Sequence, residues 1–276
     1  MTSTNRPSLV LLPGLDGTGM LFQPLVGCLP DGIRPIVVSY PNDARLGYRD
    51  LLPIVLDSLP ASPFVLLGES FSGPLAVMAA TTKPPGLRGV VLCATFVRSP
   101  VAYLPSWFSH MVRPFPLRFY PMFARLRMLL GRFSDPAVRS LTVQAVSMVG
   151  PDVVARRIRE VHRIDVAAQL ESCPVPVLYL RGDRDRLVPA SAMRAILNAC
   201  PAAEVVSFPA PHMILQTHPA AAARAISDFV QSMCSGEGPG RPEDRISTKP
   251  KDTGAERDHS SGGRQGLEMK ANVDEP

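Results

Sequence analysis

Long apolar runs are missing from this chain of 276 residues. None approaches the roughly 18 consecutive apolar residues that a membrane-spanning helix needs. The N-terminal run SLVLL is too short for the core of a signal peptide. We therefore expect no membrane span and a cytoplasmic location. The apolar fraction of 46% is nevertheless ample for a buried core, which indicates a globular protein.

Cofactor-binding patterns are also missing. The five cysteines are scattered and include no C-x-x-C pair, which argues against a zinc or redox site. The glycine-rich stretch at 14–19 contains no G-x-G-x-x-G and no P-loop lysine, so it is not expected to hold a nucleotide. The sequence thus predicts neither a metal nor an organic cofactor. A net charge of +5 is weak support for a nucleic-acid partner, and we expect none.

Short, continuously apolar runs alternate with longer helical stretches along most of the chain. Runs of this kind are typical of strands buried on both faces of a parallel sheet, and the segments between them are long enough for crossover helices. The expected strands are residues 9–12, 36–40, 64–67, 89–93, 176–180 and 204–208. The expected helices lie around 19–29, 46–59, 73–82, 190–199 and 218–233.

This alternation stops between the fourth and the fifth expected strand. Over residues 98–165, apolar residues recur at helix-like spacing between prolines, which predicts a helical cap. Residues 235–276 are rich in glycine, proline, serine and charge, and we expect them to form a disordered C-terminal tail. The core of the protein should therefore comprise residues 1–97 and 166–234.

A serine follows the third expected strand on a small-residue turn, where residues 68–73 read GESFSG. A strand, a tight turn and a helix begun by proline form the context of a nucleophile elbow. The motif is usually G-x-S-x-G, and Ser72 takes the place of the last glycine. If Ser72 were the nucleophile, Pro74 would stand where the turn needs a small residue, so the sequence favours Ser70. A turn without chemistry is the alternative unless Ser70 has partners.

A serine hydroxyl needs a base and an orienting acid to act as a nucleophile, and the loops after later strands should supply them. The stretch RGDRDRLVP follows the fifth expected strand, and PAPHMILQ follows the sixth. His212 is the one histidine of five that lies in a loop after an expected strand, so we predict it as the base. Asp183 and Asp185 compete as the acid, and we favour Asp185 because it lies nearer to the expected imidazole.

The reaction also needs two backbone N–H groups that bind the oxyanion. One should come from Phe71, the residue after the expected nucleophile. The other should come from the glycine-rich turn LLPGLDGTGM at 11–20, which follows the first expected strand. In this turn, Gly14 and Asp16 are candidate substrate contacts.

In this order and spacing, the blocks LPGLDGTG, GESFSG, GDRDRLVP and PHMILQ resemble the α/β-hydrolase superfamily, of the esterase and lipase type with a helical cap. The resemblance covers roughly residues 8–233. It implies an α/β fold with a mostly parallel sheet of about six strands, helices on both faces and a helical cap inserted before the penultimate strand. It also implies specific roles: Ser70 as nucleophile, His212 as base, Asp185 as acid, and the N–H groups of Leu15 and Phe71 as the oxyanion hole.

Two features depart from the family pattern. Pro13 stands where the family usually has a histidine, so that histidine cannot help to fix the oxyanion loop here. The first expected strand begins by residue 9, which leaves out the two leading strands of the full fold. We therefore expect a shortened sheet.

The expected cap carries an excess of positive charge, because residues 101–165 hold ten arginines against four acidic residues. An ordinary solvated helical face is the first explanation. The alternative is a basic rim that attracts an acidic acyl carrier, and the cap resembles, in role and position, that of esterases of biotin precursor synthesis. Its apolar residues suit an acyl pocket, with Trp107 and Phe119 as candidate substrate contacts.

We therefore predict a serine hydrolase that cleaves a small-molecule carboxylic ester through an acyl-enzyme. Thioesterase, acyl-carrier-linked methyl ester esterase, acyltransferase and perhydrolase activities use the same three side chains, and they stay open as alternatives. A non-catalytic receptor with the same fold is the alternative from another class. The serine nucleophile argues against dehalogenase and epoxide hydrolase activity.

Overall fold

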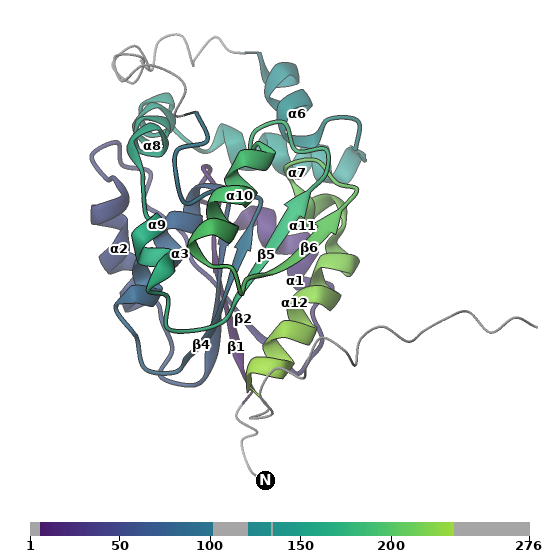
Figure 1. Ribbon diagram of the computed structural model, residues 1–276. Helices are drawn as coiled ribbons and strands as arrows, with labels where there is room; N and C mark the ends of the chain where they lie inside the picture. Colours follow the sequence, from purple (N-terminus) through teal and green to yellow (C-terminus); the bar gives the residue numbers. More distant parts are fainter. Residues whose placement is uncertain (1–5, 102–120, 134, 235–276) are drawn as a thin grey trace, which may run out of the picture. The chain divides into compact units, whose positions relative to one another are not determined.

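Six strands form one sheet in the computed structural model, which describes residues 6–101, 121–133 and 135–234 (Figure 1). Their order is β2-β1-β3-β4-β5-β6, and every neighbouring pair is parallel. The predicted six-stranded parallel sheet is therefore confirmed. The strands are β1 Ser8–Leu12, β2 Arg34–Val37, β3 Phe64–Glu69, β4 Leu87–Cys93, β5 Val177–Gly182 and β6 Glu204–Phe208.

Helices cover both faces of this sheet, as predicted. Alternate residues of β1 show how the faces are divided: Val10 and Leu12 pack into one hydrophobic core, while Leu9 and Leu11 pack into the other. The first core lies beneath α2 (Tyr48–Asp57), α3 (Gly73–Thr81), α9 (Ala167–Glu171) and α10 (Ala190–Ala199). The second lies beneath η1 (Met20–Phe22), α1 (Gln23–Val26), α11 (Ile214–Thr217) and α12 (Pro219–Cys234).

The two outermost strands differ from the prediction that all strands are buried on both faces. Strands β2 and β6 lie at the edges of the sheet and are only partly buried, and Val37 of β2 is 45% exposed. Pro35 in β2 lacks an N–H group, which an edge strand tolerates better than a central one. A continuous apolar run therefore did not distinguish an edge strand from a central strand.

Among the described residues of the segment predicted as a cap, three helices are present: α6 (Met122–Leu130), α7 (Pro136–Ser147) and α8 (Pro151–Arg163). An antiparallel bridge between Arg98 and Asp165 joins the two ends of this segment. Buried residues of α6 and α7 pack around Met213, which follows the predicted base in the sequence. The segment therefore contacts the loop that carries His212.

Several predictions concern residues outside the described part of the chain. These are Trp107 and Phe119 as substrate contacts and the disordered tail at 235–276. The limits of the cap at 98 and 165 also stay a prediction. None of the helices in the described ranges is long and apolar enough to cross a membrane.

Candidate active site

Ser70 stands where β3 passes into the short 3-10 helix η2 (Ser70–Ser72). Its backbone φ is 49°, a left-handed conformation that is uncommon for residues other than glycine and is expected at the sharp turn of a nucleophile elbow. A Cβ atom at Gly68 would lie 2.5 Å from the carbonyl oxygen of Ser72, and one at Gly73 would overlap the hydroxyl of Thr95. The two glycines therefore permit the turn that exposes Ser70.

Ser72, the other serine of the motif, is fully buried. Its hydroxyl donates a hydrogen bond to the carbonyl oxygen of Pro13, which can only accept. The hydroxyl of Tyr40 must therefore be the donor in its 2.7 Å hydrogen bond with Ser72 Oγ. Because the Ser72 hydroxyl is buried and hydrogen-bonded in this way, Ser70 is the candidate nucleophile.

A continuous chain of hydrogen bonds joins Ser70, His212 and Asp185. Nε2 of His212 lies 2.8 Å from Ser70 Oγ, and Nδ1 lies 2.8 Å from Asp185 Oδ2. The other carboxylate oxygen of Asp185 accepts hydrogen bonds from the N–H groups of Leu187 at 2.8 Å and Val188 at 3.0 Å. The three side chains come from loops after β3, β5 and β6, which meet at the carboxyl edge of the parallel sheet.

Asp183, the alternative acid, lies apart from this chain of hydrogen bonds. Its side chain is 50% exposed and forms an ion pair with Arg181 at 3.4 Å. Its backbone N–H donates to the carbonyl oxygen of Phe208, which fixes the start of the loop. The geometry therefore favours Asp185 as the partner of His212.

Burial and charge act in opposite directions on the two buried partners. Burial lowers the pKa of His212, but the charge and hydrogen bond of Asp185 and the charge of Glu69 raise it, so the net pKa lies above its ordinary value. Burial raises the pKa of Asp185, but the charge and hydrogen bond of His212 and the two backbone N–H groups bring it below its ordinary value. Asp185 is therefore kept ionised beside the imidazole.

The glycine-rich loop after β1 lies beside Ser70. A Cβ atom at Gly14 would lie 3.8 Å from the Cβ of Ser70, which places the next residue, Leu15, at the edge of the site. Asp16 Oδ2 accepts hydrogen bonds from the N–H and the hydroxyl of Thr18 and so shapes the turn. A contact of Gly14 or Asp16 with substrate stays a prediction.

Phe71, which follows the candidate nucleophile, contacts two tyrosines. Its ring stacks on that of Tyr48 with 4.5 Å between the centroids, and it meets the ring of Tyr40 edge-on at 6.5 Å. The hydroxyl of Tyr48 donates to the carbonyl oxygen of Phe71 at 2.9 Å. The N–H of Phe71 shares its peptide group with the Ser70 carbonyl, which accepts a hydrogen bond from the hydroxyl of Thr95. The peptide groups on both sides of Phe71 are therefore held by hydrogen bonds.

Sequence reasoning missed three buried polar residues near the site: Glu69, Gln216 and Arg157. Burial raises the pKa of Glu69 to about 7, the hydrogen bond from Gln216 lowers it in part, and the charges of Asp16 and His212 act in opposite directions. Gln216 Nε2 donates to Glu69 Oε1 at 3.0 Å and to the carbonyl oxygen of Leu21 at 3.1 Å. The sequence held one signal for Glu69: it is a glutamate at the end of the otherwise uncharged run that forms β3.

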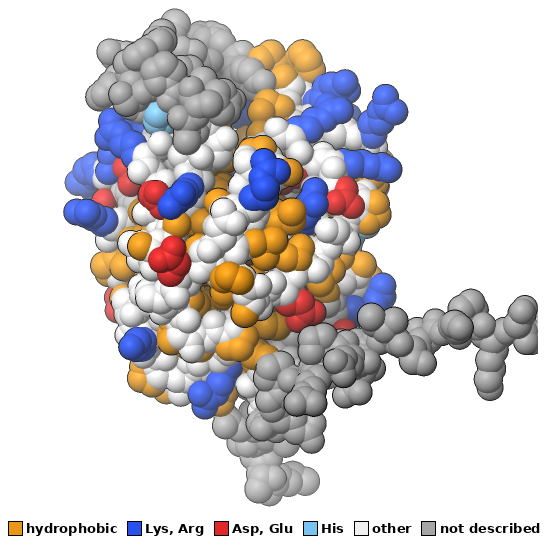
Figure 2. Space-filling view, viewed as in Figure 1, with side chains coloured by type: hydrophobic (Ala, Val, Ile, Leu, Met, Phe, Trp, Pro, Cys, Tyr) orange, Lys and Arg blue, Asp and Glu red, His pale blue; other side chains and the backbone are white. Residues whose placement is uncertain are grey.

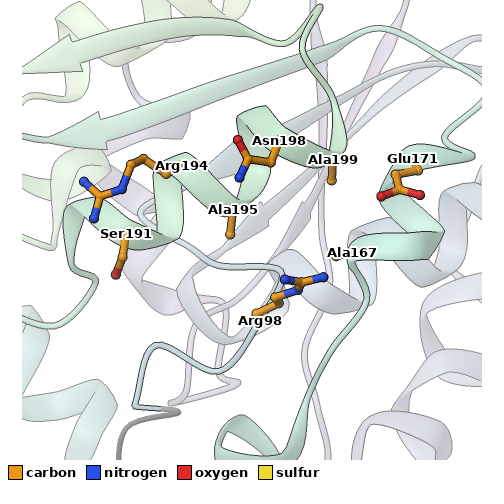
Figure 3. A pocket seen from close by; sticks show the side chains of 8 residues that line it. All are labelled: Arg98, Ala167, Glu171, Ser191, Arg194, Ala195, Asn198 and Ala199. Atoms are coloured by element: carbon orange, nitrogen blue, oxygen red, sulfur yellow. The ribbon is translucent and has the colours of Figure 1, made fainter.

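The described residues hold no group of three or more histidine, cysteine or acidic side chains that could bind a metal ion. A pocket of about 280 Å³ lies between α9 and α10, with Arg98 and Arg194 among its lining residues (Figure 3). None of Ser70, Asp185 and His212 lines this pocket, so it is separate from the candidate active site.

Comparison with known proteins places the chain in a family. A family model described as "Serine aminopeptidase, S33" matches residues 46–214, more than half of the chain. A pimeloyl-[acyl-carrier protein] methyl ester esterase of Xanthomonas oryzae pv. oryzae (strain MAFF 311018) is 30% identical over 249 residues, covering 82% of this chain and 96% of the relative. A protein of the same name from Stenotrophomonas maltophilia (strain K279a) is 28% identical over 249 residues, covering 84% and 96%.

Solved structures show the same fold. An esterase from Exiguobacterium antarcticum has a TM-score of 0.71 at 14% identity, covering 82% of this chain and 92% of the other. The enol-lactonase of Burkholderia xenovorans LB400 has a TM-score of 0.70 at 19% identity, covering 84% and 94%. Taken with the family match and the curated relatives, these likenesses show that the chain belongs to the α/β-hydrolase family and is a carboxylic ester hydrolase.

Proposed function

We propose that Ser70, His212 and Asp185 are the catalytic triad of this esterase and that its substrate is the ester of an acyl chain held on an acidic acyl carrier protein. The observation that carries the catalytic part is the hydrogen-bonded chain from Asp185 through His212 to Ser70, with 2.8 Å at both steps. The strained backbone of Ser70 supports the same assignment.

In the first half of the proposed reaction, Ser70 Oγ forms a bond to the ester carbonyl carbon while its proton passes to His212 Nε2. The N–H groups of Leu15 and Phe71 bind the negative oxygen of the tetrahedral intermediate. Asp185 accepts the Nδ1–H and stabilises the charged imidazole. The carbon–oxygen bond to the alcohol then breaks, and the leaving oxygen takes the proton from His212.

In the second half, water attacks the acyl group on Ser70 and gives a proton to His212, which returns it to Ser70 Oγ as the acid leaves. The proposal draws its nucleophile, base, acid and two N–H groups from the loops after β1, β3, β5 and β6. The reaction as written uses no metal ion and no organic cofactor.

The proposed carrier-bound substrate is supported by the curated relatives, which are named for a methyl ester on an acyl carrier protein. The described part of the cap also carries exposed positive charge, and Phe123 there is an exposed apolar residue. In Figure 2, Lys and Arg side chains are seen mainly on the half of the face where α6, α7 and α8 lie. The exposed arginines among the described residues of this segment are Arg127, Arg132, Arg139 and Arg163.

One arginine of the predicted basic rim does not belong to it. Arg157 is only 2% exposed and points into the protein, where it hydrogen-bonds to backbone carbonyl groups. Counting arginines in the sequence therefore overstated the surface charge of the cap. The docking surface is proposed for the exposed arginines alone.

The catalytic proposal is tested with p-nitrophenyl esters of increasing chain length, comparing the wild type with Ser70→Ala. Loss of the nucleophile should lower kcat by about 10⁶. A Ser70→Ala protein that turns over every ester as fast as the wild type would refute the triad. Pre-incubation with a fluorophosphonate, followed by mass analysis of the labelled peptide, checks that Ser70 is the residue modified.

The substrate proposal is tested by charge reversal. The double variant Arg132→Glu, Arg139→Glu should raise KM for a carrier-bound methyl ester by roughly tenfold, because complementary charge assists the encounter. A neutral p-nitrophenyl ester serves as the reference substrate, since it carries no charge for the arginines to attract. Arg224→Glu on α12, where the side chain is also exposed, is the matched control. An unchanged KM for the carrier-bound ester in the double variant would contradict the docking surface.

A further inference from the structure

Arg157 of α8 is a buried cation: burial lowers its pKa, and the charge of Asp16 opposes this only in part. No carboxylate in the described part of the chain lies within ion-pair distance of its guanidinium. Nη1 instead donates to the carbonyl oxygen of Leu15 at 2.8 Å, and Nη2 donates to that of Pro41 at 3.2 Å. Burying a charge without a direct ion pair is unfavourable, so its hydrogen-bond partners indicate what the side chain does.

The Leu15 carbonyl belongs to a loop in which three consecutive carbonyl groups are each held by a different donor. The hydroxyl of Ser72 holds the carbonyl of Pro13, and the N–H of Gly17 holds that of Gly14 at 3.0 Å. Arg157 holds the third, that of Leu15. The N–H of Leu15 shares its peptide group with the Gly14 carbonyl, which Gly17 holds. Arg157 fixes the next peptide group through the Leu15 carbonyl, so the peptide groups on both sides of Leu15 are held.

The same guanidinium also lies over the residue that carries the other proposed oxyanion donor. Its Cζ atom is 5.9 Å from the ring centroid of Phe71 and 5.7 Å from that of Tyr40. We propose that Arg157 is a positioning residue that fixes the Leu15 loop and the ring of Phe71 together, so that both N–H groups face the oxyanion. This inference rests on the proposed function, since it assumes that the two groups form the oxyanion hole.

The loop is shaped to receive this side chain. A Cβ atom at Gly17 would overlap Arg157 Nη1 and would lie 2.9 Å from Nη2, and the φ of Gly17 is +70°. Gly17 therefore leaves the space that the guanidinium of Arg157 fills. The family usually has a histidine at position 13 that helps to fix this loop, and Pro13 cannot do so. Here Ser72 and Arg157 fix the loop instead.

Arginine suits this position better than lysine. Its planar fork reaches two carbonyl oxygens at once and lies flat against aromatic rings. An ammonium group has neither geometry. Arg157→Lys should therefore keep the charge and lose the positioning, while Arg157→Met removes both.

The experiment measures kcat and KM on p-nitrophenyl butyrate for the wild type, Arg157→Lys and Arg157→Met, with Arg224→Lys and Arg224→Met as exposed controls. Affinities for a boronic acid, which forms a tetrahedral adduct on serine, and for the product acid are measured in parallel. Misplaced oxyanion donors should lower kcat roughly 10- to 100-fold and boronic acid affinity by the same factor. KM and product affinity should change less than about threefold.

Three outcomes would overturn the inference. One is a folded Arg157→Met protein whose kcat stays within about twofold of the wild type. Another is a fall in kcat that equals the fall in the fraction of active sites counted in a burst assay. Each remaining active site would then be unimpaired, and the role of Arg157 would be purely structural. If Arg157→Met does not fold, Arg157→Lys decides, and wild-type boronic acid affinity in that variant would overturn the inference. Failure of the proposed function is separate, because it would appear as full activity in Ser70→Ala.

Discussion

Replacing Glu69 with glutamine should make the stability of this protein less dependent on pH. The carboxyl group lies at the end of β3, is 6% exposed and accepts one hydrogen bond from Gln216. Burial raises its pKa from 4.5 to about 7, and the hydrogen bond from Gln216 offsets only part of that rise. The folded protein therefore keeps the proton over a pH range in which the unfolded chain has lost it.

The size of the effect follows from the two pKa values. A displacement from 4.5 to about 7 corresponds to ~3 kcal/mol, at about 1.4 kcal/mol for each unit. Because the folded-state pKa is raised, the neutral carboxyl contributes fully below pH 4.5, and this contribution is lost as the pH rises to about 7. Glutamine does not ionise. The stability of Glu69→Gln relative to the wild type should therefore increase by roughly 2–3 kcal/mol between pH 5 and pH 8.

Urea unfolding at pH 5 and pH 8 measures this difference, with the slope of each transition checked for two-state behaviour. Glu171→Gln is the control, since it makes the same chemical change on an exposed residue of α9. The amide also brings an N–H group near Gln216 Oε1, a buried atom without a hydrogen-bond partner among the described residues. A difference between Glu69→Gln and the wild type that is equal at both pH values would refute the reasoning.

Three further predictions concern the proposed triad and its neighbours. Asp185→Asn should lower kcat by roughly 10⁴, because His212 loses its acceptor, while Asp183→Asn should stay within about twofold of the wild type; equal losses would contradict the choice of acid. Burial lowers the pKa of His212, but the charge and hydrogen bond of Asp185 raise it above its ordinary value. Because the base must be neutral, kcat/KM should fall with decreasing pH through a midpoint above 6.5; a midpoint at or below 6.5 would show that burial dominates. Ser72→Ala should lose roughly 1–3 kcal/mol in urea unfolding, because the buried Pro13 carbonyl loses its donor, yet it should still be labelled at Ser70 by a fluorophosphonate. A folded Ser72→Ala protein that resists labelling would be inconsistent with Ser70 as the nucleophile.

The sequence was informative wherever a local pattern determines a local structure. Apolar runs predicted all six strands, and the helix from 190 to 199 is observed with the predicted bounds. The turn after β3 could be predicted because glycine, serine and proline each act within a few residues. The short helices α9 and α11 were missed, since four or five residues are too few to show a period.

What the sequence could not show depends on contacts between distant residues. Arg157 and Leu15 are 142 positions apart, and nothing local distinguishes a buried arginine from the exposed ones on the cap. The exposure of β2 and β6 depends on their place in the sheet order. The preference for Asp185 came from its distance beyond the strand, whereas its contact with His212 depends on how the loops after β5 and β6 meet.

The hydrogen bond between Arg157 and Leu15 has a consequence for protein synthesis. The loop after β1 leaves the ribosome long before α8 does, so its third carbonyl has no partner until the chain has grown past residue 157. A nascent chain that ends before α8 already contains Ser70 and its turn, yet the loop after β1 lacks its contact with Arg157. Asp185 and His212 are synthesised later still, so the groups proposed for catalysis assemble in the order Leu15, Ser70, Arg157, Asp185 and His212, and the last of them arrives with the loop after β6.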